Sequence, residues 1–400
     1  MSASQPTAAA PPRVLVIASH PIQYQVPWFR ALARRSEIDF SVLFVQIPDA
    51  KQQGHGFGVA FEWDIPLLDG YAWKLAPDVR GPGGFDGFLA ARVRKPVALL
   101  RALNPDVVVL TGWHIWPLLQ MLAAARWLRI PVIMRGESNA LRPRHLLSRI
   151  AHRALLSQCA AILPIGRSSR QFYEGYGVHS AKLFDAPYFI DNDRFASAAH
   201  VLAPERQALR RAWNIPQGAT CFLYVGKLES KKRIFDLLAA TAILARESAS
   251  FHVLVVGSGD LMAQAQAQIA QEHLPVTFAG FMNQSEIARA YAAADCLVLP
   301  SDFGETWGLV VNEAMACGLP AIVSDRVGCA QDLVTPGETG YVFPFGDVKA
   351  LATCMERSTA DPAALAAMGS RARDRVHTRY GIAQAAAGTM DAIRFVQAGA

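Results

Sequence analysis

Two glutamates eight positions apart, Glu305 and Glu313, follow the point where a predicted buried strand ends. The apolar strand at 296–300 leads into a glycine-containing loop, and the Ala- and Val-rich helix predicted after that loop ends at Gly318. Eight residues at helical rise separate the two carboxylates by about 12 Å, further than two carboxylates that share a glycosidase acid/base task. The spacing therefore favours a ligand that is held at both ends.

The middle of such a ligand is predicted to be anionic. The backbone N–H groups that open the predicted helix belong to Thr306, Trp307, Gly308 and Leu309. Free amides at a helix N-terminus bind anions, so a diphosphate suits this place. The alternative is an ordinary strand-to-helix unit with two surface acids, and for Glu313 taken alone that alternative is preferred.

The longer segment 301–320 resembles the E-x7-E signature of retaining nucleotide-sugar glycosyltransferases of family 4. Residues 321–328 and 340–347 resemble the downstream strands and loops of the same family, and the resemblance is dense from about 222 to 347. It implies the GT-B architecture, an α/β fold of two facing Rossmann-like, doubly wound parallel-sheet domains with a cleft between them. It also implies that Glu313 binds the ribose hydroxyls and that Glu305 contacts the donor sugar as a catalytic residue.

A basic segment directly follows another predicted strand. By resemblance, Lys227 takes the place of an arginine of the family, and Lys232 takes the place of its phosphate lysine, which serves binding and catalysis. An ammonium group lacks the two-pronged geometry with which a guanidinium binds phosphate, so Arg233 is expected to compensate. Any one of these residues alone would be read as a solvated charge.

Two further features belong to the expected donor side. Gly257 lies in a strand-to-glycine turn that lets the backbone approach a nucleotide, although the third glycine of a dinucleotide fingerprint is absent. Phe281 and Met282 resemble the loop of the family that contacts the base.

The first half of the chain is expected to bind the acceptor. Related enzymes have two glycines in the loop after the first strand, and this chain has none, so His20, Gln23 and Tyr24 are expected to act through their side chains. The alternative for His20 is a structural or surface histidine.

Two later loops complete the expected acceptor side. His114 matches the active-site histidine of the family, and its expected role is a hydrogen bond to the transferred sugar. Arg135 and Glu137 follow the next strand at the same edge of the cleft. The alternative for Glu137 is a structural ion pair with a neighbouring arginine.

Alternating strand and helix patterns divide the chain into two sets. The first set of predicted strands lies at 13–19, 40–46, 106–110, 131–134 and 161–164, and the second at 220–225, 252–257, 276–279, 295–300, 321–324 and 340–343. We expect a flexible tail at 1–12, a first domain at 13–190 and a second at 191–375. By resemblance, the C-terminal helix at 376–400 crosses back to the first domain.

Composition favours a large enzyme with two cores, because 52% of its 400 residues are hydrophobic and 18% are charged. Six scattered cysteines without a C-x-x-C pair indicate a reduced, cytoplasmic setting. The tail lacks the pattern of a signal peptide, and no apolar stretch is long enough to span a bilayer. No cofactor or metal is expected, because lysines supply the positive charge and the Asp-x-Asp at 191–193 reads as a polar turn away from the diphosphate.

Nine arginines against one acid, Glu137, make residues 126–170 strongly basic. A basic amphipathic helix is predicted at 142–157, and such a helix can lie on the anionic inner face of the cell membrane. The alternative, which the sequence slightly favours, is that its apolar stripe packs on the domain core. Nucleic acid is not an expected partner, because no exposed aromatics interleave with the arginines.

The function expected from this sequence is transfer of a sugar, with retention of configuration, from a UDP- or GDP-sugar to an acceptor hydroxyl of a lipid-linked or polysaccharide glycan. One alternative is a nucleotide-sugar epimerase or hydrolase of the same architecture, and another is a non-catalytic scaffold.

Overall fold

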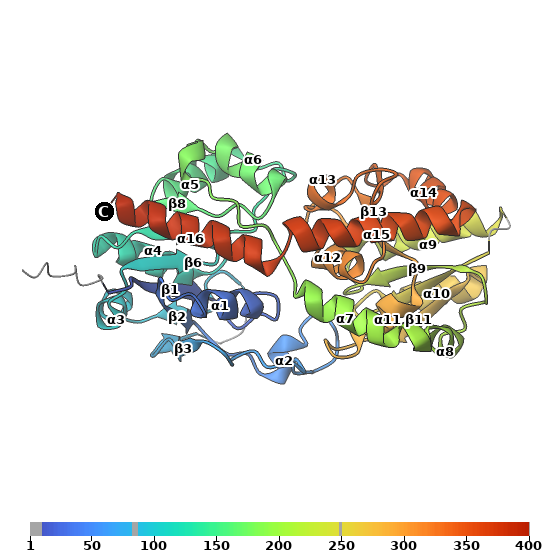
Figure 1. The fold of residues 1–400 in the computed structure, drawn as a ribbon, viewed down its shortest axis with the longest axis horizontal. Coiled ribbons are helices and arrows are strands. Elements are labelled where there is room, and N and C mark those ends of the chain that lie inside the picture. The colour runs from blue at the N-terminus through green and yellow to red at the C-terminus, as the bar shows by residue number, and fades with distance from the viewer. Residues whose placement is uncertain (1–9, 82–86, 248–249, 400) are drawn as a thin grey trace, which may run out of the picture.

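The computed structural model describes residues 10–81, 87–247 and 250–399, and two parallel six-stranded sheets lie side by side in it (Figure 1). Both sheets have the same strand order, β3-β2-β1-β6-β7-β8 in the first and β11-β10-β9-β12-β13-β14 in the second. This is the order of the doubly wound Rossmann fold. The predicted fold class, two Rossmann-like parallel-sheet domains, is confirmed; most of the predicted tail, residues 1–9, lies outside the described residues.

The strands of the two sheets have the following bounds. Those of the first sheet are β1 (Arg13–Ala18), β2 (Asp39–Phe44), β3 (Ala72–Leu75), β6 (Val107–Leu110), β7 (Val132–Met134) and β8 (Ala161–Ile162). Those of the second are β9 (Thr220–Val225), β10 (Phe251–Val256), β11 (Val276–Gly280), β12 (Cys296–Leu299), β13 (Ala321–Ser324) and β14 (Gly340–Phe343). Helices cover both faces, so the central strands read as continuous apolar runs, with β6 and β9 fully buried.

The helices alternate with these strands. In the first domain they are α1 (Val26–Ala33), α2 (Ala50–Gln53), α3 (Pro96–Leu103), α4 (Trp116–Trp127), α5 (Leu146–Leu156) and α6 (Arg167–Gly175). In the second they are α7 (Asn192–Leu202), α8 (Arg206–Ala212), α9 (Ile234–Ala245), α10 (Met262–Glu272), α11 (Ile287–Ala293), α12 (Leu309–Ala316), α13 (Ala330–Leu333), α14 (Val348–Ala360) and α15 (Pro362–Arg379). The last helix is α16 (Ile382–Ala398).

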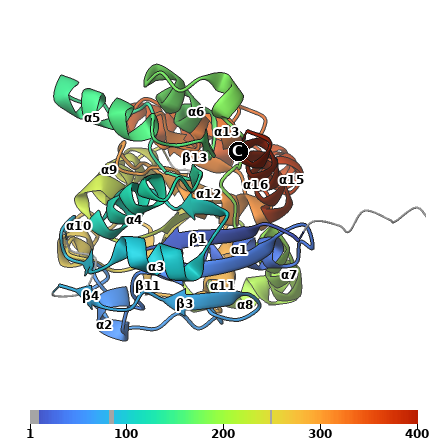
Figure 2. The same cartoon turned by 90° about the vertical axis from the view of Figure 1, so that its left-hand side faces the viewer.

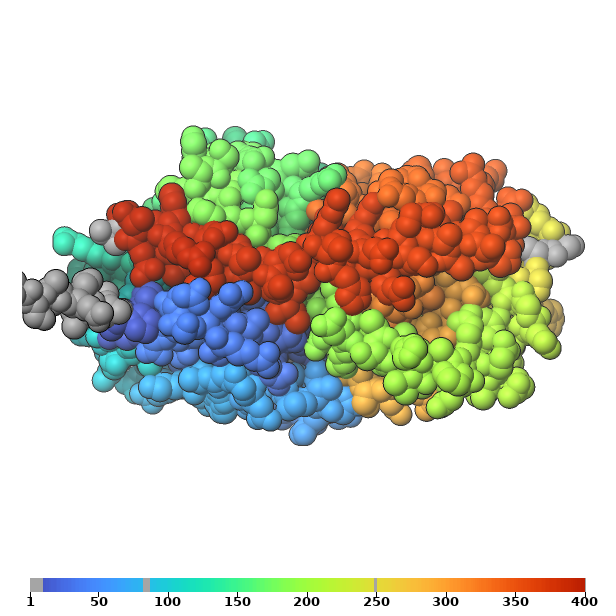
Figure 3. Space-filling view, viewed as in Figure 1, coloured from blue at the N-terminus to red at the C-terminus, as the bar shows by residue number. Residues whose placement is uncertain are grey.

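The last two helices run in succession along the two domains, α15 over the second and α16 over the first, as the red band of Figure 3 shows. Ala385 and Ile393 of α16 are buried in the core of the first domain, and the indole N–H of Trp28 donates to the Thr389 hydroxyl at 3.2 Å. The C-terminal helix is therefore part of the first domain's core.

Three expectations about local structure were wrong. The edge strand β3 and the antiparallel pair β4 (Val79–Arg80) and β5 (Arg92–Val93) were not predicted, because these strands are short and most of their side chains are exposed, which leaves no apolar pattern. Helix α12 begins at Leu309 and not at Thr306, because Gly308 has a φ of +100° and ends the loop. The Asp191 carboxylate is no part of a turn; it accepts from the Arg194 amide and caps α7.

The basic helix α5 lies at the edge of the first domain (Figure 2). Several of its apolar side chains are exposed. Leu146, Leu147 and Ile150 are 70%, 80% and 58% exposed. Leu155, at the end of the predicted stripe, packs against the core of the first domain. The alternative that the sequence favoured, packing of the stripe on the core, therefore holds for Leu155 and is wrong for Leu147 and Ile150. In the described part of the chain, no helix is both long and apolar enough to cross a membrane.

Candidate functional site

The loops that follow the strands of the two sheets enclose a cavity of about 750 Å³ to which both domains contribute. The second domain supplies Gly226, Lys227, Lys232, Gly257, Phe281, Met282, Val310 and Glu313 among its lining residues. The first domain supplies His20, Gln23, Tyr24, and a group between Pro48 and Trp63. Side chains expected at the acceptor and at the donor thus share one space.

Glu313 lies in the wall of this cavity and is 1% exposed. Its carboxylate accepts two hydroxyl hydrogen bonds, from Tyr291 at 2.6 Å and from Tyr24 at 2.9 Å. Burial raises the pKa of this carboxyl, and the two hydroxyl donors oppose the rise. Tyr24, expected on the acceptor side, instead contacts the carboxylate expected to bind ribose.

Lys232 and Glu305 form an ion pair, and both side chains are largely buried. The loop that carries Glu305 is held from two sides, because its amide donates to the Asp302 carbonyl at 3.0 Å and its carbonyl accepts from the Gly328 amide at 3.1 Å. A Cβ at Gly328 would lie 1.8 Å from the Thr306 carbonyl oxygen, so glycine permits this close approach. The structure brings the expected phosphate lysine and the expected sugar-binding acid together.

Lys227 is held by the first domain. Its ammonium donates to the His55 carbonyl at 2.7 Å and lies 4.8 Å from the centre of the Phe57 ring. Burial lowers the pKa of this lysine. Arg233, expected to compensate for the missing guanidinium, pairs with Asp236 of its own helix at 2.8 Å and does not line the cavity, so that expectation was wrong.

The remaining donor-side expectations divide into two groups. Gly257 lines the cavity with a φ of +132°, and a Cβ there would lie 2.0 Å from the Gly226 carbonyl oxygen. Phe281 and Met282 line it too. Trp307, Gly308 and Leu309 do not line it; the Trp307 side chain is buried and donates to Asn312 at 2.8 Å. The residue at the start of α12 that faces the cavity is Val310, because the helix begins later than expected.

A second cavity of about 390 Å³ lies beside the Glu305 loop and is lined by His114, Glu137, Thr306, Arg142 and Arg144, among others. Burial lowers the pKa of His114, so its imidazole is neutral near pH 7. Glu137 accepts from the Tyr188 hydroxyl and from the Thr306 hydroxyl at 3.3 Å. Within the described residues it forms no ion pair with an arginine, so the expected alternative, a structural ion pair, is not the role of this acid.

Two residues expected to bind acceptor lie in different surroundings. Arg135 is 2% exposed and lines neither cavity; its guanidinium lies 5.0–5.4 Å from the ring centres of Trp28, Tyr188 and Phe189. The acceptor-binding expectation for Arg135 is therefore wrong. His20 lines the larger cavity, and burial lowers the pKa of its imidazole to about 4, so it is neutral.

Sequence reasoning missed the contribution of residues 48–64, which reach from the first domain to the second. The available signal was the group of aromatic residues Phe57, Phe61 and Trp63 in an otherwise polar, glycine-containing loop. Within the described residues, no cluster of three or more His, Cys, Asp or Glu side chains is placed to hold a metal ion.

The chain is similar in sequence to known glycosyltransferases. Residues 205–375 match the family Glycosyl transferases group 1, so the chain carries a domain of that family. The chain is 28% identical to the 2-deoxystreptamine glucosyltransferase of Streptomyces kanamyceticus over 78% of this chain and 84% of that protein. It is 34% identical to the GDP-mannose-dependent alpha-mannosyltransferase of Mycobacterium tuberculosis over 40% of this chain and 37% of that protein.

The fold is shared with solved structures. Anabaena HepE in complex with UDP superposes with a TM-score of 0.72 at 17% identity, covering 96% of this chain and 99% of that one. WaaG, a glycosyltransferase involved in lipopolysaccharide biosynthesis, superposes with a TM-score of 0.60 at 16% identity, covering 92% and 95%. At identities of 16–17%, these superpositions show a shared two-domain fold and nothing further.

Proposed function

We propose that this chain, which carries a glycosyl transferases group 1 domain, transfers a sugar from a UDP- or GDP-sugar to an acceptor hydroxyl with retention of configuration. The observation that supports this proposal most is that Lys232 and the buried Glu313 line one cavity between the domains. Glu305 lines neither cavity but is held beside the larger one by its ion pair with Lys232. The relatives include a glucosyltransferase and a GDP-mannose-dependent enzyme. Both donor classes therefore stay within the proposal.

In this proposal the donor lies along the second domain. Glu313 binds the ribose hydroxyls, and Lys227 and Lys232 bind the diphosphate, where negative charge develops as the sugar departs. Because the two lysines supply positive charge, transfer needs no metal or cofactor, and a chelator should leave turnover unchanged.

The transferred sugar is proposed to lie at the boundary of the two cavities. Glu305 contacts it from the second domain, and neutral His114 donates or accepts a hydrogen bond from the first. Glu137 is positioned by Tyr188 and Thr306 to meet an acceptor hydroxyl. The departing phosphate takes the acceptor's proton, which retains configuration when attack occurs on the face that the leaving group vacates.

Calorimetric titration with UDP, GDP, ADP and TDP tests the donor site. We expect one nucleotide to bind wild-type protein, Glu313→Ala to weaken that binding, and Lys232→Ala chiefly to lower turnover. Asp374→Ala, an exposed position on α15, is the matched control. Lack of binding by the wild type would overturn the proposal; isomerised or free sugar formed without acceptor would favour an epimerase or hydrolase.

We also propose that α5 rests on an anionic membrane surface at the cytoplasmic face, which would bring the enzyme to a lipid-linked acceptor. Leu146, Leu147 and Ile150 are exposed together, and Arg149 and Arg153 on the same helix are exposed as well. Apolar side chains beside cations suit anionic lipid. The segment just before α5 also lines the second cavity, through Arg142 and Arg144.

Flotation with vesicles tests the membrane proposal. We expect the protein to float with phosphatidylglycerol-containing vesicles, to stay behind with pure phosphatidylcholine, and to detach as salt is raised. The pair Leu147→Asp and Ile150→Asp should abolish flotation. Val201→Asp, at a 69% exposed position in the second domain, should leave it intact. Equal flotation of both variants would contradict the proposal.

A further inference from the structure

Residues 48–64, here called the strap, leave the first domain after β2 and lie at the junction of the two domains around α2 (Figure 1). The conformation of the strap is held by hydrogen bonds within it. Asp49 caps α2 by accepting from the Gln52 amide at 2.8 Å, and the Phe61 amide donates to the Ala50 carbonyl at 3.1 Å. A Cβ on Gly54 would lie 1.9 Å from the Val59 carbonyl oxygen, so the turn closes tightly.

The strap is bonded to three successive loops of the second sheet. After β9, Lys227 donates to the His55 carbonyl at 2.7 Å, and after β10 the Ser258 hydroxyl donates to the Phe57 carbonyl. After β11, the Asn283 amide group donates to the Glu62 carbonyl at 2.7 Å. These bonds hold the strap across the ends of the strands, where open α/β sheets bind their ligands.

Three further hydrogen bonds hold the far end of the strap, all between Ser285 and Asp64. The Ser285 backbone amide donates to both carboxylate oxygens of Asp64, at 3.1 and 3.2 Å, and the Ser285 hydroxyl also donates to this carboxylate. The strap therefore contacts the second domain at several points between His55 and Asp64.

The aromatic side chains of the strap meet the loop after β11. Phe57 and Phe61 pack against Phe281, with ring centres 5.1 and 4.4 Å apart, and Phe61 packs against Trp63 at 4.8 Å. Phe57, Trp63 and Phe281 all line the larger cavity. Because Phe57 also covers the ammonium of Lys227, these rings adjoin the cationic part of the cavity.

We propose that the strap forms the first-domain wall of the nucleobase pocket, in which Phe57 and Trp63 contact the planar base opposite the second domain. This inference rests on the proposed function, because it takes the occupant to be a nucleoside diphosphate. Every nucleobase has an aromatic face, whichever hydrogen-bonding groups lie on its edge. Stacking of that face on an aromatic side chain contributes about 1–3 kcal/mol per base. The donor is thus held by both domains at its base.

The test compares a nucleotide with its phosphate part alone. Calorimetry with the preferred nucleoside diphosphate, and displacement of that nucleotide by inorganic pyrophosphate, are measured for wild type, Phe57→Ala and Trp63→Ala. We expect roughly 5- to 100-fold weaker nucleotide binding in both variants, which corresponds to about 1–3 kcal/mol, with little change in the pyrophosphate affinity. Phe57→Tyr, which keeps a ring, should bind nearly as the wild type does.

Val59→Ala is the matched control, because Val59 lies in the same strap, is 44% exposed and does not line the cavity. Nucleotide binding by wild type and by both alanine variants with equal affinity would overturn this inference and leave the proposed function standing. Equal losses of nucleotide and pyrophosphate would also overturn it, since the strap would then act on the phosphate site. If the wild type binds no nucleotide, the proposed function fails and the inference fails with it.

Discussion

The Glu313 carboxylate accepts one hydrogen bond from each domain, from the Tyr291 hydroxyl of the second and from the Tyr24 hydroxyl of the first. A buried carboxylate needs such donors, because an unsatisfied charge away from water is costly. Ribose hydroxyls are donors of the same kind, so a nucleotide bound at Glu313 would take the place of Tyr24. The unliganded site is thus satisfied by the protein itself.

Tyr24→Phe should therefore tighten nucleotide binding, because the wild type has to break the Tyr24–Glu313 hydrogen bond before ribose can bind. A hydrogen bond to a charged group contributes about 1.5–3 kcal/mol, so a gain of roughly 3- to 10-fold is expected after the ring adjusts. Calorimetry measures it, and a lower melting temperature should accompany it. Weaker binding in the variant would mean that Tyr24 stays bonded to Glu313 in the complex.

His252 provides a test of pH dependence away from the cavity. Its Nε2 lies 2.9 Å from the Thr277 hydroxyl, and burial lowers the pKa of the imidazole to about 4. The folded-state pKa lies below the ordinary value of about 6.5, so between these values the unfolded chain binds the extra proton. The stability contributed by neutral His252 is present above pH 6.5 and is lost as the pH falls toward 4.

His252→Gln keeps a hydrogen-bonding side chain without this titration. We expect the melting temperature of the wild type to fall more steeply than that of the variant between pH 6.5 and 4. Parallel curves for the two proteins would show that His252 does not titrate in this range.

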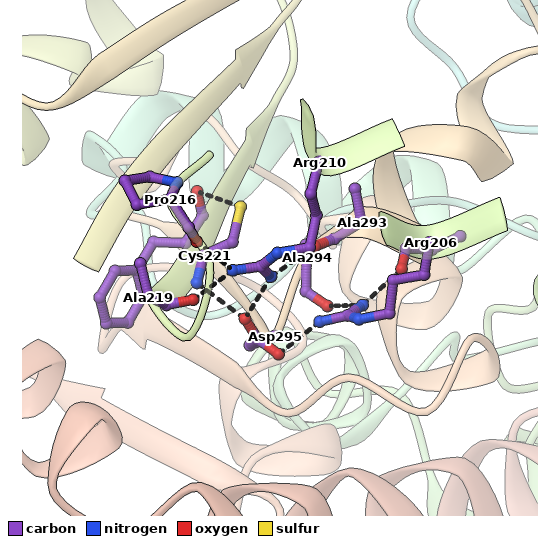
Figure 4. Close-up of polar contacts among 10 residues, drawn as sticks. Arg206, Arg210, Pro216, Ala219, Cys221, Ala293, Ala294 and Asp295 are labelled. Atoms are coloured by element: carbon purple, nitrogen blue, oxygen red, sulfur yellow. Dashed lines mark hydrogen bonds and ion pairs between the residues drawn. The ribbon is translucent and has the colours of Figure 1, made fainter. Parts of the chain in front are cut away.

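At the scale of elements, Asp295 joins α8 to the start of two central strands (Figure 4). Its carboxylate pairs with Arg206 at 2.6 Å and Arg210 at 3.0 Å, and it accepts from the Cys221 amide at 2.8 Å. The two guanidiniums also donate to backbone carbonyls at Ala293 and Ala294. Asp295 thus orients two arginines, and these bind backbone carbonyls just before β12, at the end of the sheet farthest from the cavity.

Asp295→Ala should destabilise the second domain, because it leaves the nearly buried Arg210 without its counter-ion. The expected loss in the free energy of unfolding is on the order of 2–4 kcal/mol, below the upper range for buried pairs since Asp295 is partly exposed. Urea unfolding measures it, with Asp374→Ala as the exposed control. A loss no larger than in that control would contradict the role assigned to the network.

At the scale of the whole molecule, α16 makes the first domain depend on the end of the chain. Gly388 lies against the end of the first domain, and a Cβ there would be 2.0 Å from the Asp185 carbonyl oxygen. The helix approaches so closely only because this position has no side chain.

Gly388→Ala should push α16 away from the first domain. Overpacking of this kind costs about 1–3 kcal/mol, so we expect a lower melting temperature and easier proteolysis near α16. Ala387→Ser, at the exposed neighbouring position, should leave both unchanged. A melting temperature equal to that of the wild type would mean that α16 can move away from Asp185 without loss of stability.

The sequence by itself determined the two parallel sheets, apart from the edge strand β3, and several cavity-lining residues of the second domain, among them Lys232 and Glu313. Continuous apolar strands alternating with helices are local patterns, and their pairing into parallel sheets follows from chain connectivity. Lys232 and Glu305 lie in the segments that follow β9 and β12, and Glu313 lies in α12, the helix after the second of these segments. The ends of neighbouring parallel strands share one edge of a sheet, so the proximity of Lys232 and Glu305 follows from the same rule.

Only the tertiary structure decided what the first domain contributes. Tyr24 and Glu313 are 289 positions apart, and the strap meets its partners across a similar distance in sequence, so no local period reveals these contacts. The same holds for Arg135 and the exposed stripe of α5, whose surroundings depend on how neighbouring elements pack. The periodicity of a sequence predicts which side chains share one face of a helix or strand. Only the packing of elements and domains determines which residues that face contacts.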